Sequence, residues 1–221
     1  MADNTYVGKI VYATVFSISM AFIESAVVVY LRALYYPDGF SFPLKLMTNN
    51  LMGIEVLREG ATIFMLLSVA ALAGKRFWER FAYFIFCFGI WDIFYYVWLK
   101  FLIDWPLSIV EWDILFLIPL PWIGPVIAPI TISVLMLISG MVIVRLFHRG
   151  YDFKPTTPSV ILFLIGSGII LYSFMRDTGA TLHQQEPMPY LYKLLIIGAM
   201  LYITSFIISY RRIVHTSRGI V

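Results

Sequence analysis

Acidic residues inside apolar segments are the residues of this sequence best suited to chemistry. Glu24, Glu59 and Asp92 each lie within a long hydrophobic stretch, and Glu55 lies one helical turn from Glu59. An ionisable side chain in hydrocarbon costs about 2.5–3.5 kcal/mol on insertion scales, so each one needs a structural or functional reason. Buried membrane carboxylates often mark ion pathways, proton relays or substrate sites.

The three deeper acids are predicted to lie at a similar depth in the membrane. At a rise of about 1.5 Å per residue, Glu24 and Glu59 fall roughly 12 Å, and Asp92 roughly 16 Å, from the outer ends of their helices. The three residues belong to three consecutive apolar segments. We therefore expect them to face a common point in the outer half of the bilayer.

Other polar side chains complete the candidate substrate- or ion-binding site. Arg58 adjoins Glu59, the series Asp92, Tyr96 and Lys100 follows one helix face at four-residue spacing, and His183 lies in an outer loop. One interpretation is a polar cavity that opens to the outer face. The alternative is that Arg58, Lys100 or Arg176 neutralises the acids, or that they are protonated, and that they only set helix register.

Other chemistries find less support in the sequence. The four carboxylates and His183 could hold a metal pair, but the Glu-x-x-His pairs of di-iron bundles are absent, and we assign no metal ligands. No histidine lies within a span, which argues against bis-histidine haem. Gly166-Ser167-Gly168 lacks the strand–turn–helix setting of a nucleophile. The sequence leaves any cofactor unknown.

Composition indicates that the elements holding these acids cross a membrane. Of the 221 residues 61% are hydrophobic and 13% charged, about half the charge of a typical soluble domain. The aromatic content of 17% suits anchoring at two membrane–water interfaces, an aromatic belt. The net charge of +3 is scattered, so nucleic acid is not expected as a partner. The single cysteine, Cys87, excludes an internal disulfide.

Hydropathy predicts an all-α, polytopic membrane helical bundle of about six transmembrane helices. A span needs about 20 apolar residues to cross about 30 Å of hydrocarbon. We expect a single integral membrane domain over residues 1–221, its first span retained rather than cleaved as a signal peptide. The predicted spans cover residues 10–34, 51–74, 81–103, 126–147, 159–175 and 191–210.

The distribution of basic residues predicts the orientation. Ten Lys and Arg fall on the side of the termini: Lys9, Lys75, Arg76, Arg80, Arg145, Arg149, Lys154, Arg211, Arg212 and Arg218. Six fall on the other side or near it: Arg32, Lys45, Arg58, Lys100, Arg176 and Lys193. The positive-inside rule then predicts a multi-pass protein of the cell inner (plasma) membrane with cytoplasmic N- and C-termini.

A proline-rich segment near residues 105–121 is too short to span. Its apolar stretch from Leu107 to Ile118 contains two acids and lies between prolines, which suits an interfacial or re-entrant element. A helix lying on the surface is favoured over a re-entrant element lining a pathway. The prolines that follow forbid regular helix until about Pro129.

Three functions agree with these observations. The first is an intramembrane carboxylate site, open to the outer face, that binds or translocates a proton, a cation or a small polar solute. The second is a membrane enzyme acting on a lipophilic substrate, with the carboxylates as metal ligands or as an acid/base pair. The third is a structural subunit of a larger membrane complex. Partners would be the lipid bilayer and either other membrane subunits or further copies of the chain.

Overall fold

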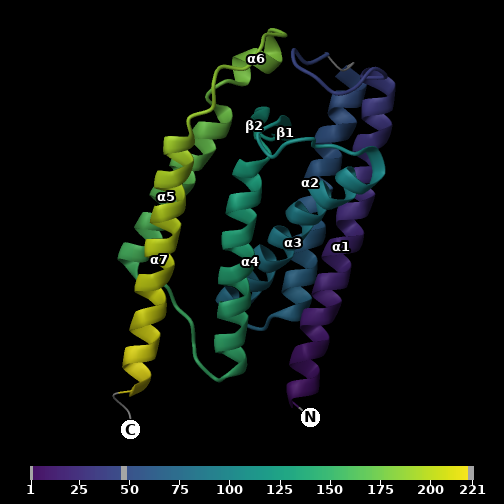
Figure 1. Ribbon diagram of the computed structural model, residues 1–221. Helices are drawn as coiled ribbons and strands as arrows, with labels where there is room; N and C mark the ends of the chain where they lie inside the picture. The colour runs from purple at the N-terminus through teal and green to yellow at the C-terminus, as the bar shows by residue number, and fades with distance from the viewer. Residues whose placement is uncertain (1, 46–48, 219–221) are drawn as a thin grey trace.

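Six long helices make up most of the protein, as the sequence predicted. The computed structural model describes residues 2–45 and 49–218 (Figure 1). Each long helix contains a segment long and apolar enough to cross a membrane. The chain is therefore a multi-pass membrane protein with an all-α bundle. The helices are α1 (Ala2–Tyr35), α2 (Asn49–Ala73), α3 (Phe77–Ile103), α4 (Ile127–His148), α5 (Thr157–Met175) and α7 (Tyr192–Arg218).

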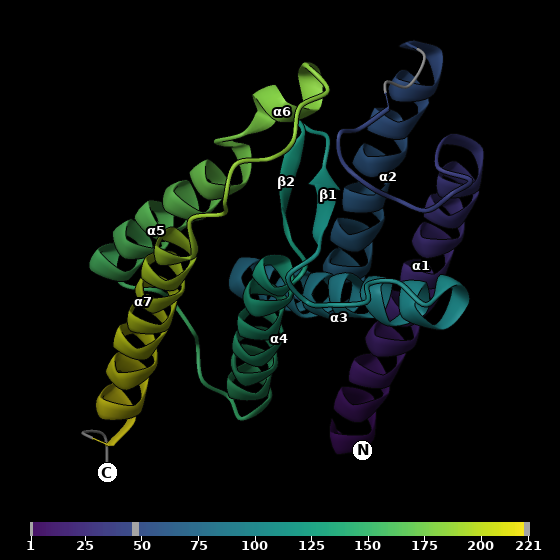
Figure 2. The ribbon, with the colours of Figure 1, turned by 45° about the horizontal axis from the view of Figure 1, so that its top comes forward.

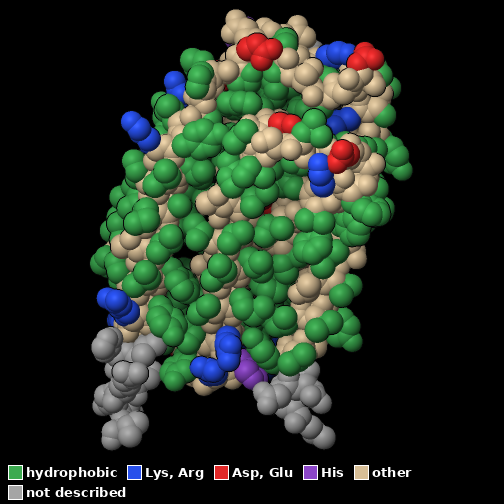
Figure 3. All heavy atoms as spheres, in the orientation of Figure 1, with side chains coloured by type: hydrophobic (Ala, Val, Ile, Leu, Met, Phe, Trp, Pro, Cys, Tyr) green, Lys and Arg blue, Asp and Glu red, His purple; other side chains and the backbone are tan. Residues whose placement is uncertain are grey.

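The molecular surface fits a lipid environment. On the face shown in Figure 3, hydrophobic side chains cover the middle of the molecule, and most charged side chains lie toward its two ends. Helix α1 begins and α7 ends at the same end of the bundle (Figure 1). We refer to this as the termini end and to the other as the opposite end.

Helix α3 occupies the centre of the first four helices. It packs against α1, α2 and α4, and Figure 2 shows it running across the other three. A Cβ on Gly89 of α3 would lie 2.5 Å from the carbonyl oxygen of Ser133, and one on Gly140 of α4 would lie 2.7 Å from that of Ala82. Small residues thus bring the α3 and α4 backbones together, as is common in membrane bundles.

Helices α5 and α7 form a second packing unit held by hydroxyl groups. The hydroxyls of Ser159 and Ser209 lie 2.6 Å apart, and the Ser205 hydroxyl donates to the Ser159 carbonyl at 2.7 Å. A Cβ on Gly198 would lie 2.5 Å from the side chain of Ile170, so this pair is also closely packed. Contacts with α4 and with a short hairpin join this unit to the rest of the bundle.

The segment after α3 forms a β-hairpin, and the interpretation of a surface-lying helix over Leu107–Ile118 is wrong. Strands β1 (Trp112–Phe116) and β2 (Trp122–Pro125) pair antiparallel, with Asp113 opposite Gly124 and Ile114 opposite Ile123. Prolines around the turn deny helical hydrogen bonds and disfavour helical backbone in the preceding residues. Pairing between the two strands instead satisfies backbone N–H and C=O groups of this segment. Such groups are costly when they lack hydrogen bonds inside a membrane bundle.

The hairpin and a short helix lie toward the opposite end. Figure 2 shows β1 and β2 between α2 and the short helix α6 (Thr178–Leu182). Helix α4 begins at Ile127, directly after the proline-rich segment, and carries Pro129 in its first turn, as the sequence predicted.

The main hydrophobic core lies on the termini side of the buried acids. It is built from buried residues of α1, α2, α3 and α4, among them Ala21, Leu66, Phe86 and Val144. Ala21 and Leu66 precede the acids of their helices when counted from the termini end. The core therefore fills the bundle between the buried acids and the termini end. The hairpin covers these acids from the opposite end.

Candidate functional site

A cavity of about 110 Å³ lies between α1, α2, α3 and β1. Its volume is enough for several water-sized groups. Aromatic rings form much of its wall, including Tyr36, Phe40, Trp91 and Tyr95. Charged side chains from four elements also line it: Glu24, Arg32, Glu55, Arg58, Glu59, Asp92 and Asp113. The three acids expected to share a level in the membrane thus line one cavity.

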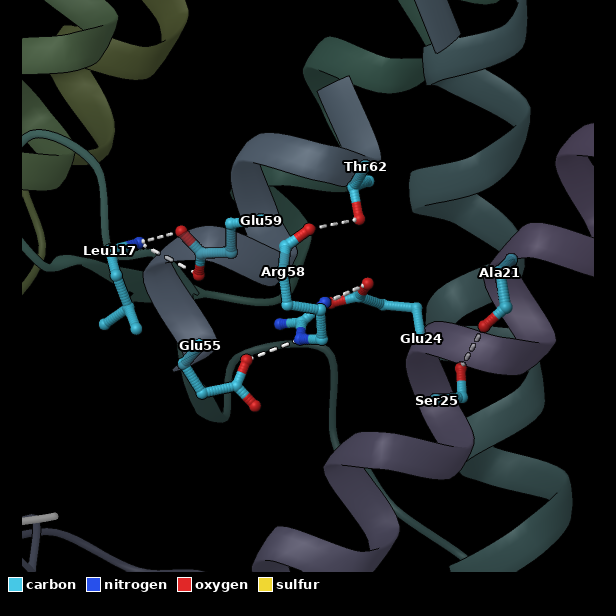
Figure 4. A network of polar contacts seen from close by, with 8 residues as sticks. All are labelled: Ala21, Glu24, Ser25, Glu55, Arg58, Glu59, Thr62 and Leu117. Atoms are coloured by element: carbon cyan, nitrogen blue, oxygen red, sulfur yellow. Dashed lines mark hydrogen bonds and ion pairs between the residues drawn. The ribbon is translucent and has the colours of Figure 1, made fainter. Parts of the chain in front are cut away.

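Arg58 joins two of the carboxylates across the space between α2 and α1. Its Nε donates to Glu55 Oε2 at 2.5 Å, and its Nη1 donates to Glu24 Oε2 (Figure 4). Glu55 precedes Arg58 by one helical turn, so the α-helical repeat places both on one face. A single guanidinium is shared between two carboxylates, so this group retains a formal negative charge.

Packing of α1 on α3 sets the direction of Glu24. The Ser25 hydroxyl lies 2.8 Å from the Ala21 carbonyl oxygen (Figure 4). It also lies 3.1 Å from the Tyr95 carbonyl oxygen on α3. Trp98 Nε1 also donates to the Ile18 carbonyl at 3.1 Å. These contacts fix the rotation of α1, and Glu24 consequently points toward Arg58 rather than toward lipid.

Glu59 is held by backbone rather than by a basic side chain. Its two carboxylate oxygens lie 3.1 and 2.8 Å from the backbone nitrogen of Leu117, which follows β1 (Figure 4). Glu59 is buried. Among residues 6–45 and 50–213, whose side chains the structure describes, no Lys, Arg or His lies within ion-pair distance of it. Its charge is therefore solvated by one amide but is not cancelled by an ion pair.

Asp92 likewise relies on a neutral donor. The Ser133 hydroxyl on α4 donates to Asp92 Oδ2 at 2.7 Å, across the close contact between α3 and α4. In the part of the chain that the structure describes, Asp92 forms no ion pair. Asp92 and Glu59 therefore differ from Glu24 and Glu55, whose charges Arg58 offsets.

A second buried ion pair joins Arg32 and Asp113, and it was not predicted from the sequence. Arg32 Nη2 lies 3.0 Å from Asp113 Oδ1, with side chains only 10% and 3% exposed. The guanidinium carbon lies 3.7 Å from the ring centre of Trp105 and 4.3 Å from that of Phe40. Burial raises the pKa of the Asp113 carboxyl above its usual range, although the Arg32 charge opposes this shift.

Only one weak signal in the sequence pointed to this pair. The two residues are 81 positions apart, so no helical spacing relates them. Asp113 interrupts an apolar stretch, which indicates that it needs a partner, but the stretch was interpreted as lying on the surface. The hairpin carries Asp113 inward, beside the outer turn of α1.

Two buried donors at the cavity lack acceptors. Arg32 Nη1 and Trp91 Nε1 have no hydrogen-bond partner among the described residues, and both residues line the cavity. A buried donor left unsatisfied costs about 1–3 kcal/mol. A group in the cavity that carries an acceptor oxygen would satisfy such a donor.

Of the other residues of the candidate site, Tyr96 lines the cavity, but Lys100 and His183 do not. Lys100 is exposed at the end of α3, and its Nζ pairs with Asp104 at 2.6 Å. His183 is exposed at the end of α6, with Nδ1 3.0 Å from the Gly179 carbonyl oxygen. Each of these two side chains is held within its own chain segment, so neither reaches the carboxylates.

The charges of the cavity lining favour a cation. Its carboxylates outnumber its guanidiniums, five against two, so the lining carries a formal excess of three negative charges when all are ionised. Within the described ranges, no three His, Cys, Asp or Glu side chains are grouped closely enough to hold a metal ion.

Comparison of the chain with protein-family models, curated proteins and solved structures found no match.

Proposed function

We propose that this membrane protein binds a small organic cation in the carboxylate cavity, which would be the substrate site of a transporter. The cation enters from the end opposite the termini, which is the outer face if the basic loops of the termini end are cytoplasmic. The observation that carries the proposal is the excess of carboxylates among the side chains that line a single cavity. On this proposal the chain lies in the cell inner membrane.

Electrostatics favours a cation over a neutral or anionic solute. A unit charge about 4 Å from a carboxylate gains about 4 kcal/mol at an effective dielectric constant near 20. Glu59 and Asp92 form no ion pair within the described residues, so in the ionised form each offers a negative charge to a ligand. A neutral solute would gain no such energy and would leave both charges uncompensated.

The lining favours an alkylammonium ion over a bare metal ion. Hard cations such as Ca²⁺ need several oxygen ligands at once, and the described acids are not grouped in that way. An ammonium ion can instead reach separate carboxylates and lie against aromatic rings such as Tyr95 and Trp91. An oxygen on the same molecule could accept from Arg32 Nη1.

Binding can be tested by thermal unfolding of the detergent-purified protein. The probes are ethanolammonium, methylammonium and sodium chlorides, with ionic strength held constant by N-methylglucammonium, a much bulkier ammonium ion. We expect saturable stabilisation by ethanolammonium, about 2.7 kcal/mol at a concentration 100 times its Kd. Methylammonium should bind more weakly because it carries no oxygen.

The matched variants locate the site. Glu59→Gln combined with Asp92→Asn should abolish the stabilisation by ethanolammonium, because both uncompensated charges are removed. Lys100→Gln, on the same helix as Asp92 but outside the cavity, should retain it. If no probe stabilises the wild-type protein more than N-methylglucammonium does, the proposal is refuted. Uptake of labelled methylammonium into proteoliposomes then tests transport, and wild-type binding without uptake would refute that part.

A further inference from the structure

A second cavity, of about 460 Å³, lies at the termini end of the bundle. It is bounded by the first turns of α1, the connection between α2 and α3, and the end of α4 with the residues after it. These are the ends of four candidate membrane spans. The cavity is therefore at the level where lipid headgroups meet water.

Its charge is opposite to that of the carboxylate cavity. Lys9, Lys75 and Arg76 line it, against the single acid Glu79. One oxygen of Glu79 is turned to the backbone, accepting from the amide of Lys75 at 2.7 Å and that of Arg76 at 3.4 Å. The acid thus caps the start of α3 with one oxygen and is outnumbered in the lining by the three cations.

The three cations differ in how far they are already engaged. Lys9 Nζ donates to the Ala73 carbonyl at the end of α2, at 2.6 Å, which leaves two of its hydrogens. Arg76 Nη1 lies 2.8 Å from Asp152, a carboxylate that also pairs with Lys154. Lys75 is exposed and forms no ion pair with any described residue.

Apart from these charged residues, the wall of the cavity is mostly aromatic and apolar. The rings of Tyr6 and His148 stack with centroids 4.2 Å apart, and Phe147 and Val144 add hydrocarbon surface. A free inorganic anion would gain nothing from such a wall. A phosphate attached to a glycerol and acyl chains could place its oxygens on the cations and its carbon atoms against the rings.

We infer that this cavity binds the phosphate group of an anionic membrane lipid, in the leaflet at the termini end. Lys75 and Lys9 supply ammonium hydrogens to the phosphate oxygens, and Arg76 adds charge from the rim. Basic pockets between transmembrane helices recognise lipid headgroups in this way. The inference is independent of the carboxylate cavity, which lies beyond the hydrophobic core.

Native mass spectrometry or thermal unfolding of the detergent-purified protein can test this site. The probes are dioctanoyl phosphatidylglycerol, which is anionic, dioctanoyl phosphatidylcholine, which carries a phosphate but no net charge, and inorganic phosphate, all at constant ionic strength. We expect the phosphatidylglycerol to bind at least ten times more tightly than the phosphatidylcholine. Inorganic phosphate at equal concentration should not displace it.

The variant Lys75→Gln should weaken binding of phosphatidylglycerol at least tenfold. Lys75 is exposed and unpaired within the described part of the chain, so this change should leave folding intact. Arg145→Gln, an exposed basic residue at the same end that does not line the cavity, is the matched control and should leave binding unchanged. Equal effects of the two variants, or equal binding of the two lipids, would overturn the inference. Displacement by inorganic phosphate would overturn the assignment to a lipid.

Discussion

Replacement of Arg32 by Met should strongly destabilise the protein, because it leaves a buried carboxylate without its counter-charge. Asp113 is 3% exposed and has its cation at 3.0 Å. Removing one partner of a buried ion pair costs about 3–5 kcal/mol, most of it the penalty of the isolated charge. The loss of the contacts with Trp105 and Phe40 adds about 0.5–2 kcal/mol, part of which the apolar Met side chain recovers.

The double variant Arg32→Met with Asp113→Asn isolates this effect. Neutral groups of similar size often replace a buried ion pair with little loss of stability. We therefore expect the free energy of unfolding of the double variant to lie within about 1–2 kcal/mol of the wild-type value. The coupling energy of the cycle should then exceed about 2 kcal/mol. Equilibrium unfolding in mixed micelles, titrated with sodium dodecyl sulfate, measures all four proteins. Surface substitutions typically change the free energy of unfolding by less than about 0.5 kcal/mol. If both single variants stay within that range of the wild-type value, the reasoning is refuted.

The pH dependence of the same variant gives a second readout. Burial already raises the pKa of Asp113 above its ordinary 3.8, and the Arg32 charge opposes this, so its removal should raise the pKa further. A carboxyl whose pKa is higher in the folded state binds more protons there, so the free energy of unfolding falls as pH rises from 3.8 through the folded pKa. The destabilisation by Arg32→Met should therefore be larger at pH 8 than at pH 5. An equal loss at both values would contradict a charge-based cause.

Two further predictions concern the contact between α3 and α4. Gly140→Ala should lower the free energy of unfolding by about 1–3 kcal/mol through overpacking, because its Cβ would lie 2.7 Å from the Ala82 carbonyl oxygen. The control Gly168→Ala, whose Cβ would have nothing within 4 Å, should be neutral or stabilising. Equal Tm values for the two variants would contradict the close approach of α3 and α4. Ser133→Ala should lower the free energy of unfolding by about 1.5–3 kcal/mol, because it removes the hydroxyl that donates to Asp92. The loss should be smaller when Ser133→Ala is combined with Asp92→Asn, and unfolding of the single and double variants measures this difference.

A common level along the helices could be predicted for three of the acids from the sequence, but their partners could not. Positions along a helix follow directly from a fixed rise per residue, so Glu24, Glu59 and Asp92 could be placed at one level from the sequence. Which side chain meets which depends on how each helix is rotated and which helix stands beside it. Arg58 could have neutralised any acid nearby, and the structure places it between Glu24 and Glu55.

The segment after α3 shows where local patterns mislead. Its length and apolar character suit a short surface helix, and only the prolines argue against that. The pairing of β1 with β2 joins residues on either side of a turn, and its burial depends on α1 supplying Arg32 to Asp113. Lys100 shows the reverse case, since it follows the helical spacing of Asp92 but lies beyond the cavity and pairs with Asp104.

Sequence alone determined that the chain forms six apolar helices, since hydrophobic length is a local property that lipid selects directly. It also determined that charges are carried into the membrane by the first three helices. Only the tertiary structure decided that these charges line one cavity, which of them are paired, and that a hairpin covers them. Contacts between helices arise from close packing and hydrogen bonding among residues far apart in the chain, and no periodicity along one segment encodes them.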